Sequence, residues 1–303
     1  MTEVVRLKRL DFLQFSINKH PMTILLTGAT GKSATPLAKL LLEANKSVVL
    51  ANRSGRVPAP FRGARFDWLD ASTYGIPFEV DATIDRIYLI APRILDMLPP
   101  MKAFIDFAID KGVKRFVLMS AGLIEAGGPG MGLVHEYLAS LSVEYCVLRP
   151  SYFFDNLLLI YSDSIRRSNE ILSAAEDGLI GHISTEDIAE QAFKALVNPV
   201  IENAQPILVG PELLSYDQIA AMLSQVLGRE IKHKRLHADD YTKVLMQRGM
   251  PEDYAQRMSG ADVIIAGGAE ERLFKRADFV GKRRLREFLE ANKDAQQWRA
   301  KTG

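Results

Sequence analysis

Three side chains near the middle of the chain have the chemistry to bind a cation. Tyr152 and Phe153 offer aromatic faces and Asp155 offers a carboxylate, shortly after the apolar stretch 144–148. Aromatic rings attract cations, and a fixed anion stabilises positive charge. If 144–148 is a strand of an open parallel sheet, these residues stand at its carboxyl end, where such sheets bind ligands. They are candidates for a substrate pocket, and at least one of the three consecutive rings Tyr152, Phe153 and Phe154 is expected to be core.

Two further groups have the chemistry to move protons. Glu125 opens a glycine-rich loop, and His135 lies on the helix expected after it. Carboxylates and imidazoles are common general acids and bases. A single helical histidine is more often capped or solvated than catalytic, and Cys146 among apolar neighbours is expected to be core. No cluster of His, Cys or carboxylate residues has metal-ligand spacing, so no metal is predicted.

A glycine-rich turn follows the first apolar stretch, 22–26. Its sequence, TGATGKS, contains Gly28 and Gly31. A strand that breaks into such a turn and then opens a helix presents backbone N–H groups to a pyrophosphate. The NTPase phosphate loop is excluded, because it requires a glycine where Leu26 stands. The turn therefore favours a dinucleotide site.

The residues after the second expected strand, 47–51, indicate which dinucleotide binds. An NAD-binding strand usually ends in Asp or Glu, whereas an arginine accommodates a 2′-phosphate. Here Arg53 and Ser54 follow the strand and Lys32 stands in the turn, so the sequence predicts NADP(H). The other expected cofactor contacts come from the turn and the ends of later strands: Gly28, Thr30, Gly31, Asp67, Trp68, Ala91, Pro92, Ser120, Ala121, Pro150 and Phe153.

Apolar and amphipathic stretches alternate through the first half of the chain. Strands are expected at 22–26, 47–51, 64–68, 86–91, 115–119, 144–148 and 205–209. Helices are expected at 31–44, 99–111, around 135–138, at 185–193 and 215–227, twice within 239–260, and at 281–291. This order predicts right-handed β-α-β units. The fold class is therefore α/β, a Rossmann-type doubly wound parallel sheet with a smaller, interleaved, mostly helical part.

This organisation predicts two parts of the chain with different binding roles. Residues 22–155 are expected to form the NADP(H)-binding Rossmann domain, and residues 156–303 mainly a substrate-binding lid. Elements near 185–210 are expected to return to the first domain. Residues 1–21 are expected to be an N-terminal arm of unknown role.

The composition limits the class of protein. The chain has 303 residues, 48% of them hydrophobic, which is enough for a substantial core. With 38 basic and 37 acidic residues, no global field would draw it to nucleic acid or a membrane. No apolar run approaches the roughly 20 residues of a spanning helix. We expect a cytoplasmic protein with a small-molecule partner, and the oligomeric state is left open.

A series of motifs resembles the NmrA-like family of atypical short-chain dehydrogenases. They are TGATGK at 27–32, NRS at 52–54, YLIAP at 88–92, GVKRFV at 112–117, LRP at 148–150 and ISTEDIA at 183–189. Within that family, FDW at 66–68, GGPGMG at 127–132 and Asp155-Asn156 make the chain similar to the ergot-alkaloid festuclavine and agroclavine dehydrogenases. The resemblance implies a Rossmann domain, NADPH and an indole-alkaloid substrate, because those enzymes reduce a cyclic iminium.

The residues leave three functions open. The Tyr-x-x-x-Lys proton relay of ordinary short-chain reductases is absent, since Leu141 stands four residues after Tyr137. An iminium accepts hydride without a proton donor, so its reduction, with Asp155 as the anion, is the favoured reading. The alternative is a redox-neutral Pictet–Spengler closure, in which Asp155 or Glu125 works with Tyr152 or His135 and the cofactor is structural. A third possibility is a regulator that binds NADP without catalysis.

Overall fold

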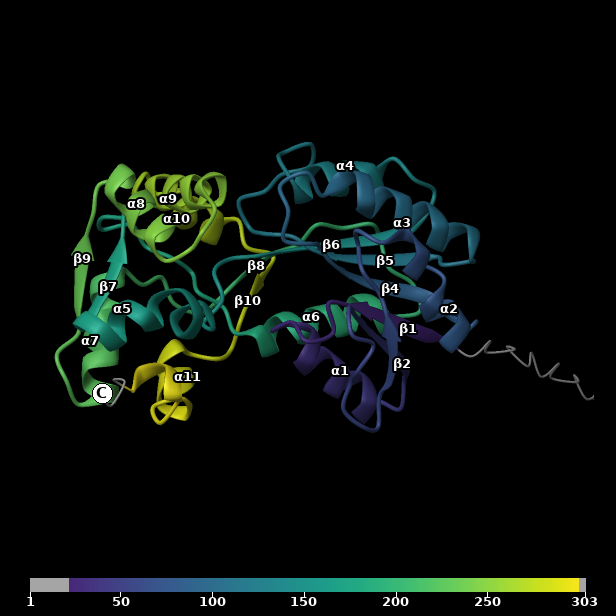
Figure 1. Cartoon of the computed structure of the whole chain (residues 1–303), viewed down its shortest axis with the longest axis horizontal. Helices are drawn as coiled ribbons and strands as arrows, with labels where there is room; N and C mark the ends of the chain where they lie inside the picture. Colours follow the sequence, from purple (N-terminus) through teal and green to yellow (C-terminus); the bar gives the residue numbers. More distant parts are fainter. Residues whose placement is uncertain (1–21, 300–303) are drawn as a thin grey trace, which may run out of the picture.

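The computed structural model describes residues 22–299, so the arm predicted for residues 1–21 lies outside the described residues. A parallel sheet of eight strands crosses the molecule (Figure 1). Its strands are β1 (Thr23–Thr27), β2 (Ser47–Asn52), β3 (Arg62–Arg65), β4 (Ile84–Ile90), β5 (Arg115–Met119), β6 (Glu144–Pro150), β8 (Ile207–Val209) and β10 (Phe279–Val280). Their order is β10-β8-β6-β5-β4-β1-β2-β3, which confirms the predicted doubly wound fold.

Helices cover both faces of this sheet. α1 (Ala34–Glu43) and α6 (Thr185–Val197) lie on one face, and α3 (Leu98–Asp110) and α4 (Met131–Ala139) lie on the other (Figure 1). A short helix, α2 (Ile76–Val80), precedes β4. Helix α1 buries residues at helical spacing, namely Ala34, Leu37, Ala38 and Leu41. The sheet is therefore covered on both sides, as all-parallel sheets require.

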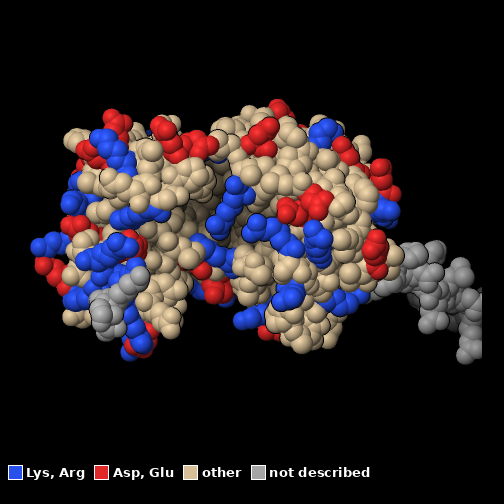
Figure 2. Space-filling view, in the orientation of Figure 1, with Lys and Arg blue, Asp and Glu red and all other residues tan. Residues whose placement is uncertain are grey.

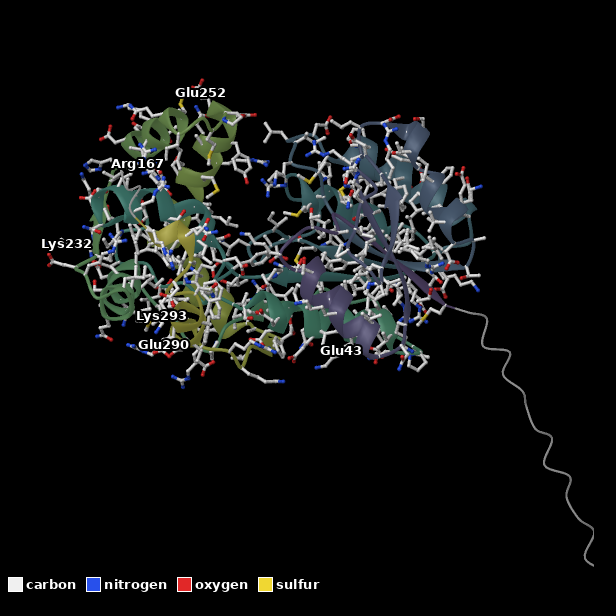
Figure 3. The ribbon with its side chains drawn as sticks, turned by 60° about the horizontal axis from the view of Figure 1, so that its bottom comes forward. Glu43, Arg167, Lys232, Glu252, Glu290 and Lys293 are labelled. Atoms are coloured by element: carbon white, nitrogen blue, oxygen red, sulfur yellow. The ribbon has the colours of Figure 1, made fainter. Side chains whose placement is uncertain are left out.

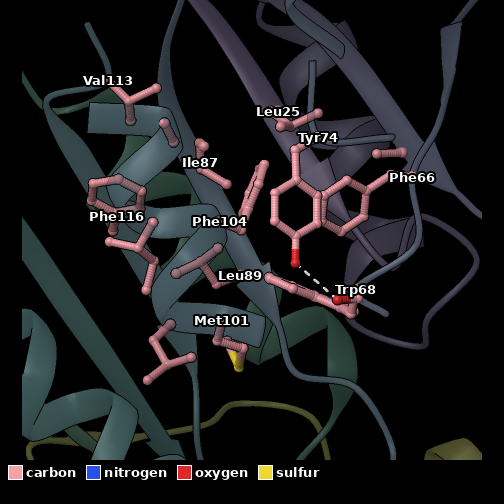
Figure 4. Packing of buried hydrophobic residues seen from close by; sticks show 14 of the residues in the cluster. Leu25, Phe66, Trp68, Tyr74, Ile87, Leu89, Met101, Phe104, Val113 and Phe116 are labelled. Atoms are coloured by element: carbon pink, nitrogen blue, oxygen red, sulfur yellow. Dashed lines mark hydrogen bonds between the residues drawn. The ribbon is translucent and has the colours of Figure 1, made fainter. Parts of the chain in front are cut away.

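The alternation of side chains along the strands divides the core into two layers. In β1, Leu25 belongs to the layer under α3, whereas Ile24 and Leu26 belong to the layer under α1 and α6. Phe66, Trp68, Tyr74 and Phe104 pack in the first layer (Figure 4). The hydroxyl of Tyr74 donates a hydrogen bond to the carbonyl oxygen of Trp68 at 2.9 Å.

Trp68 lies in the core and not at the cofactor site predicted from the sequence. It was predicted to contact the cofactor, but its indole is buried in this aromatic cluster, and Nε1 donates to the carbonyl oxygen of Ile90 at 3.1 Å. The predicted strand 64–68 spans Arg62–Arg65 instead. After the strand ends, the chain turns back at Asp67 and Asp70, and the indole packs in the core layer under α3.

The second half of the chain builds a smaller lobe beside the sheet (Figure 1). It contains α5 (Ser162–Ser168), α7 (Tyr216–Leu227), α8 (Ala238–Gln247), α9 (Glu252–Ala266), α10 (Ala269–Lys275) and α11 (Leu285–Ala291). A two-stranded parallel sheet, β7 (Glu170–Ser173) with β9 (Lys232–Arg235), completes it. The predicted helix 215–227 is confirmed with a capping box between Ser215 and Gln218. The helix predicted from residue 281 begins only at Leu285, because β10 and a connecting turn precede it.

Many charged side chains lie on the outside of both parts. Figure 3 shows Glu43, Lys232, Glu252 and Glu290 pointing away from the ribbon. Within residues 22–299, none of the helices combines the length and the apolar character needed to cross a membrane.

Candidate functional site

A cleft of about 910 Å³ lies at the carboxyl ends of the central strands, between the sheet and the smaller lobe. Figure 2 shows the hollow between the two parts, with Lys and Arg side chains gathered around it. Its sheet side includes the glycine turn and the segments that follow β4, β5 and β6. Its far wall is made by α9 and α10. Open α/β sheets bind ligands at this edge.

The glycine turn has a shape that only glycines fit closely. Gly28 has φ +63°, and a Cβ there would lie 3.1 Å from Cβ of Ile90. A Cβ on Gly31 would lie 2.9 Å from the carbonyl oxygen of Gly28. The N–H of Ala29 donates to the carbonyl oxygen of Ala51 at 3.1 Å, which fixes the turn beside the end of β2. The two glycines therefore allow a tight turn with an open backbone.

The amide groups at the start of α1 are free to bind an anion. Within residues 22–299, the N–H groups of Lys32, Ser33 and Ala34 have no hydrogen-bond acceptor. Unpaired N–H groups at a helix N-terminus form an anion site, strengthened by the helix dipole. The turn thus fits the pyrophosphate of a dinucleotide, as its sequence predicts.

Lys32 lines the cleft beside this turn. Its Nζ donates to Oδ1 of Asn156 at 3.1 Å and lies 6.0 Å from the centre of the Phe153 ring. Burial lowers the pKa of Lys32, and the nearby carboxylate of Asp155 partly opposes this shift. Lys32 therefore brings positive charge to the pyrophosphate end of the cleft.

Asp155, expected to face the substrate, is not among the residues that line the cleft. Burial raises the pKa of its carboxyl, and Lys32 lowers it. The chain after Asp155 enters a π-helical turn, Leu157–Tyr161, and the carboxyl lies near Thr185 and Glu186 at the start of α6. Asp155 therefore lies behind the cleft lining, where its carboxyl and the Lys32 ammonium influence each other's pKa.

His135 also lies outside the cleft lining. Its side chain is buried in α4 and packs against the ring of Tyr145, with ring centres 6.2 Å apart. Burial lowers the pKa of His135, with a further contribution from Arg149. His135 is therefore a buried residue outside the cleft lining, and its lowered pKa favours the neutral imidazole.

Glu125 lines the cleft, but it is already paired. Its Oε1 lies 2.7 Å from Nη2 of the buried Arg149 and 3.8 Å from Nη2 of Arg276. The hydrogen bond from Arg149 lowers the pKa of Glu125. Glu125 is thus an ionised residue that anchors its loop, and it is a weak base.

The other predicted contacts divide between the cleft and its surroundings. Those in the lining are Gly31, Lys32, Ser120, Ala121, Pro150, Tyr152 and Phe153. Arg53, Ser54 and Thr30 are exposed near the glycine turn, while Asp67, Ala91 and Pro92 are half-buried outside the lining. Ser120 is notable because its Oγ is buried and has no hydrogen-bond partner within residues 22–299.

Glu270 is a lining residue that the sequence analysis missed. It lies on α10, is 1% exposed, and its Oε2 accepts a hydrogen bond from Oγ of Ser151 at 2.5 Å. Burial raises the pKa of this carboxyl. Helix α10 was not predicted, and Glu270 stands within an ordinary charged run, so only the tertiary packing brings it to the cleft. Arg93 and Arg257 were missed in the same way.

Tyr137 lies near the sequence position of the Tyr-x-x-x-Lys relay, but its hydroxyl points away from the cleft. The hydroxyl of Tyr137 bonds Nζ of Lys102 at 2.8 Å and the carboxylate of Asp106, between α3 and α4. Tyr137 does not line the cleft. It therefore cannot serve as the proton donor to a bound substrate.

Gly260 leaves room in the far wall of the cleft. It lies inside α9, lines the cleft with Arg257, Ala261 and Ile264, and has nothing within 4 Å of an added Cβ. Glycine in a helix interior costs about 1 kcal/mol relative to alanine. We therefore expect Gly260→Ala to stabilise the fold by about 0.5–1 kcal/mol in urea denaturation.

Gly249 provides a matched control for this prediction. A Cβ there also meets nothing within 4 Å, but its φ is +87°. Gly249→Ala should destabilise the protein by about 1 kcal/mol, because the left-handed conformation disfavours a side chain. Equal shifts for the two variants would show that helix propensity does not govern position 260.

The chain is similar in sequence to curated fungal enzymes. A scan against models of protein families gives no match. The chain is 43% identical over 283 residues to an agroclavine dehydrogenase of Claviceps fusiformis, covering 90% of this chain and 98% of the relative. It is 40% identical over 258 residues to festuclavine synthase II of Penicillium roqueforti, covering 82% and 90%.

A solved structure shares the fold at lower identity. It is the NADPH-dependent quinone oxidoreductase QOR2 of Escherichia coli, with a TM-score of 0.72, 20% identity, and coverage of 88% of this chain and 99% of that one. With the two sequence relatives, the assignment is plain. The chain belongs to the family of the fungal agroclavine and festuclavine dehydrogenases, within the NmrA-like atypical short-chain dehydrogenases.

Proposed function

We propose that this chain is an NADPH-dependent oxidoreductase of indole-alkaloid biosynthesis that reduces an iminium by hydride transfer. The observation that carries the proposal is one cleft that joins an anion-binding turn to an apolar wall, with Tyr137 turned away from it. The sequence relatives are named for agroclavine and festuclavine, and the solved structure of similar fold is an NADPH-dependent oxidoreductase.

The cofactor would lie across the carboxyl ends of the strands. The N–H groups of Lys32, Ser33 and Ala34 would hold its pyrophosphate, and Arg53 would pair with the 2′-phosphate. Ser54 helps to place Arg53, because Oδ1 of Asn52 accepts hydrogen bonds from the N–H and the hydroxyl of Ser54 at 2.9 and 2.8 Å. When bound, NADPH supplies the hydride.

The rest of the cleft suits a planar, apolar cation. Its lining includes apolar and aromatic side chains, namely Ile90, Leu123, Ile264 and Tyr152. An iminium carbon needs no proton on a neighbouring oxygen before it accepts hydride. The chain therefore needs only to orient the substrate and to offset its charge, which a fixed carboxylate can do.

The stoichiometry of NADPH consumption tests this function. Purified protein mixed with an indole-alkaloid iminium should consume one NADPH for each product molecule. NADP⁺ should support no product. Formation of product with NADP⁺, or without loss of NADPH, would exclude reduction.

A redox-neutral Pictet–Spengler closure is the second candidate. Glu270 favours it, because a carboxyl in the cleft wall with a raised pKa can carry a proton to and from a substrate. NADP(H) would then be a structural ligand. In that case the product would form equally with either oxidation state of the cofactor.

A further inference from the structure

Glu270 is a buried carboxylate that the protein does not neutralise. It is 1% exposed, and within residues 22–299 no Lys, Arg or His side chain forms an ion pair with it. Its hydrogen-bond donors, the hydroxyl of Ser151 and the N–H of Gly181, are both neutral. The charged side chain that contributes to its raised pKa is another acid, Glu271.

An arrangement of this kind is costly for the fold. Burying an ionised carboxylate without a cation loses its hydration, and neutral hydrogen bonds recover only part of that loss. The charge of Glu125, the other carboxylate of the cleft lining, is instead compensated by an ion pair with Arg149. Unpaired buried charges of this sort are concentrated at functional sites.

The position of Glu270 indicates what would neutralise it. It reaches the cleft from α10, whereas Lys32 lines the cleft beside the glycine turn. Tyr152 also lines the cleft and lies close enough to Glu270 for their charges to interact. Glu270 therefore stands by an aromatic face, in a wall that faces the sheet side of the cleft.

We propose that Glu270 is the counter-ion of the substrate, held by Ser151 and Gly181 so that its carboxylate pairs with a cationic nitrogen in the cleft. The assignment rests on the function proposed above in one respect, namely that the ligand is a polycyclic cation. It adds the residue that selects for positive charge. Glu270 thereby takes the place that the sequence analysis gave to Asp155.

Binding of two matched probes tests this assignment without turnover. The cation is N,N-dimethyl-tetrahydro-β-carbolinium, and its uncharged analogue is tetrahydrocarbazole. Neither can accept hydride. Calorimetry on the full chain with NADPH should show the cation binding at least tenfold more tightly than the neutral ring. Glu270→Gln, which keeps an oxygen for Ser151 and Gly181, should abolish that preference.

The control is Glu271→Gln, which removes the same charge from the next residue, outside the cleft lining. It should keep the preference for the cation. Glu270→Gln should melt at the same or a higher temperature than the parent, because it removes a buried unpaired charge. A retained preference in Glu270→Gln, no preference in the parent, or a lowered melting temperature that marks a structural role would overturn the assignment.

The two proposals can fail separately. If hydride is never transferred but the preference for the cation still depends on Glu270, the counter-ion stands and the reductase does not. If hydride is transferred but Glu270→Gln still prefers the cation, the reductase stands and the counter-ion does not.

Discussion

Replacement of Arg53 by alanine is expected to weaken NADPH binding by about 10- to 100-fold and to leave NADH binding nearly unchanged, the range for a lost charge-assisted hydrogen bond. Arg53 is exposed at the end of β2, next to the glycine turn, and within residues 22–299 it forms no ion pair. Its guanidinium is therefore free for a phosphate. The 2′-phosphate is the only group that distinguishes the two cofactors.

Titration of each dinucleotide against the Arg53→Ala protein measures this effect. Arg56, another exposed arginine of the same loop, provides the control. Arg56→Ala should change the ratio of the two affinities less than twofold. Equal losses of NADPH and NADH in Arg53→Ala would show that Arg53 does not recognise the 2′-phosphate.

Replacement of Asp187 by alanine is expected to destabilise the protein by about 2–4 kcal/mol, because it leaves two backbone N–H donors without an acceptor, at about 1–3 kcal/mol each. The Asp187 side chain on α6 is fully buried. It accepts hydrogen bonds from the N–H groups of Lys282 and Arg283, both at 3.1 Å, and pairs with the guanidinium of Arg283. Its loss leaves the two backbone N–H groups without an acceptor, whereas the guanidinium of Arg283 keeps its second partner, Glu190.

This contact also matters for the cleft. It joins the first turn of α6 to the segment between β10 and α11, and the chain just before α6 contacts the cleft-lining segment that follows β6. There the N–H of Ile183 donates to the carbonyl oxygen of Tyr152 at 2.8 Å. Loosening α6 should therefore reduce turnover as well as stability.

Urea denaturation of two variants separates the buried pair from its exposed neighbour. Glu190 also pairs with Arg283, at 2.9 Å, but its side chain is 25% exposed. Glu190→Ala should cost about 1 kcal/mol or less, as for other partly solvated ion pairs. If both variants lost the same stability, the burial of Asp187 would not be the cause.

The parts that the sequence predicts well are those set by local patterns. The strand-turn-helix at Gly28 and Gly31 depends on backbone conformation and helix geometry, which neighbouring residues determine. The alternation of apolar and amphipathic stretches likewise predicts the sheet, because central strands such as β1 and β5 are buried on both faces. Strand β9, with the sequence KHKR, lacks any apolar pattern and was missed for that reason.

The parts that the sequence does not predict depend on tertiary packing. Asp155 lies five residues after the end of β6, yet its carboxyl lies near Lys32 and the start of α6, outside the cleft lining. Glu270 lies more than a hundred residues further along the chain and reaches Ser151 only because α10 folds back over the cleft. Residue type alone gives no sign of such contacts.

The fate of the hydride is the most direct test of the proposed function. NADPH carrying deuterium at C4 of the nicotinamide, on the face that is transferred, should place one deuterium on the former iminium carbon of the product. The match between label lost from the cofactor and label gained by the product should be complete. Product without deuterium, formed at the same rate with unlabelled NADP⁺, would contradict reduction and favour ring closure with the cofactor as a scaffold.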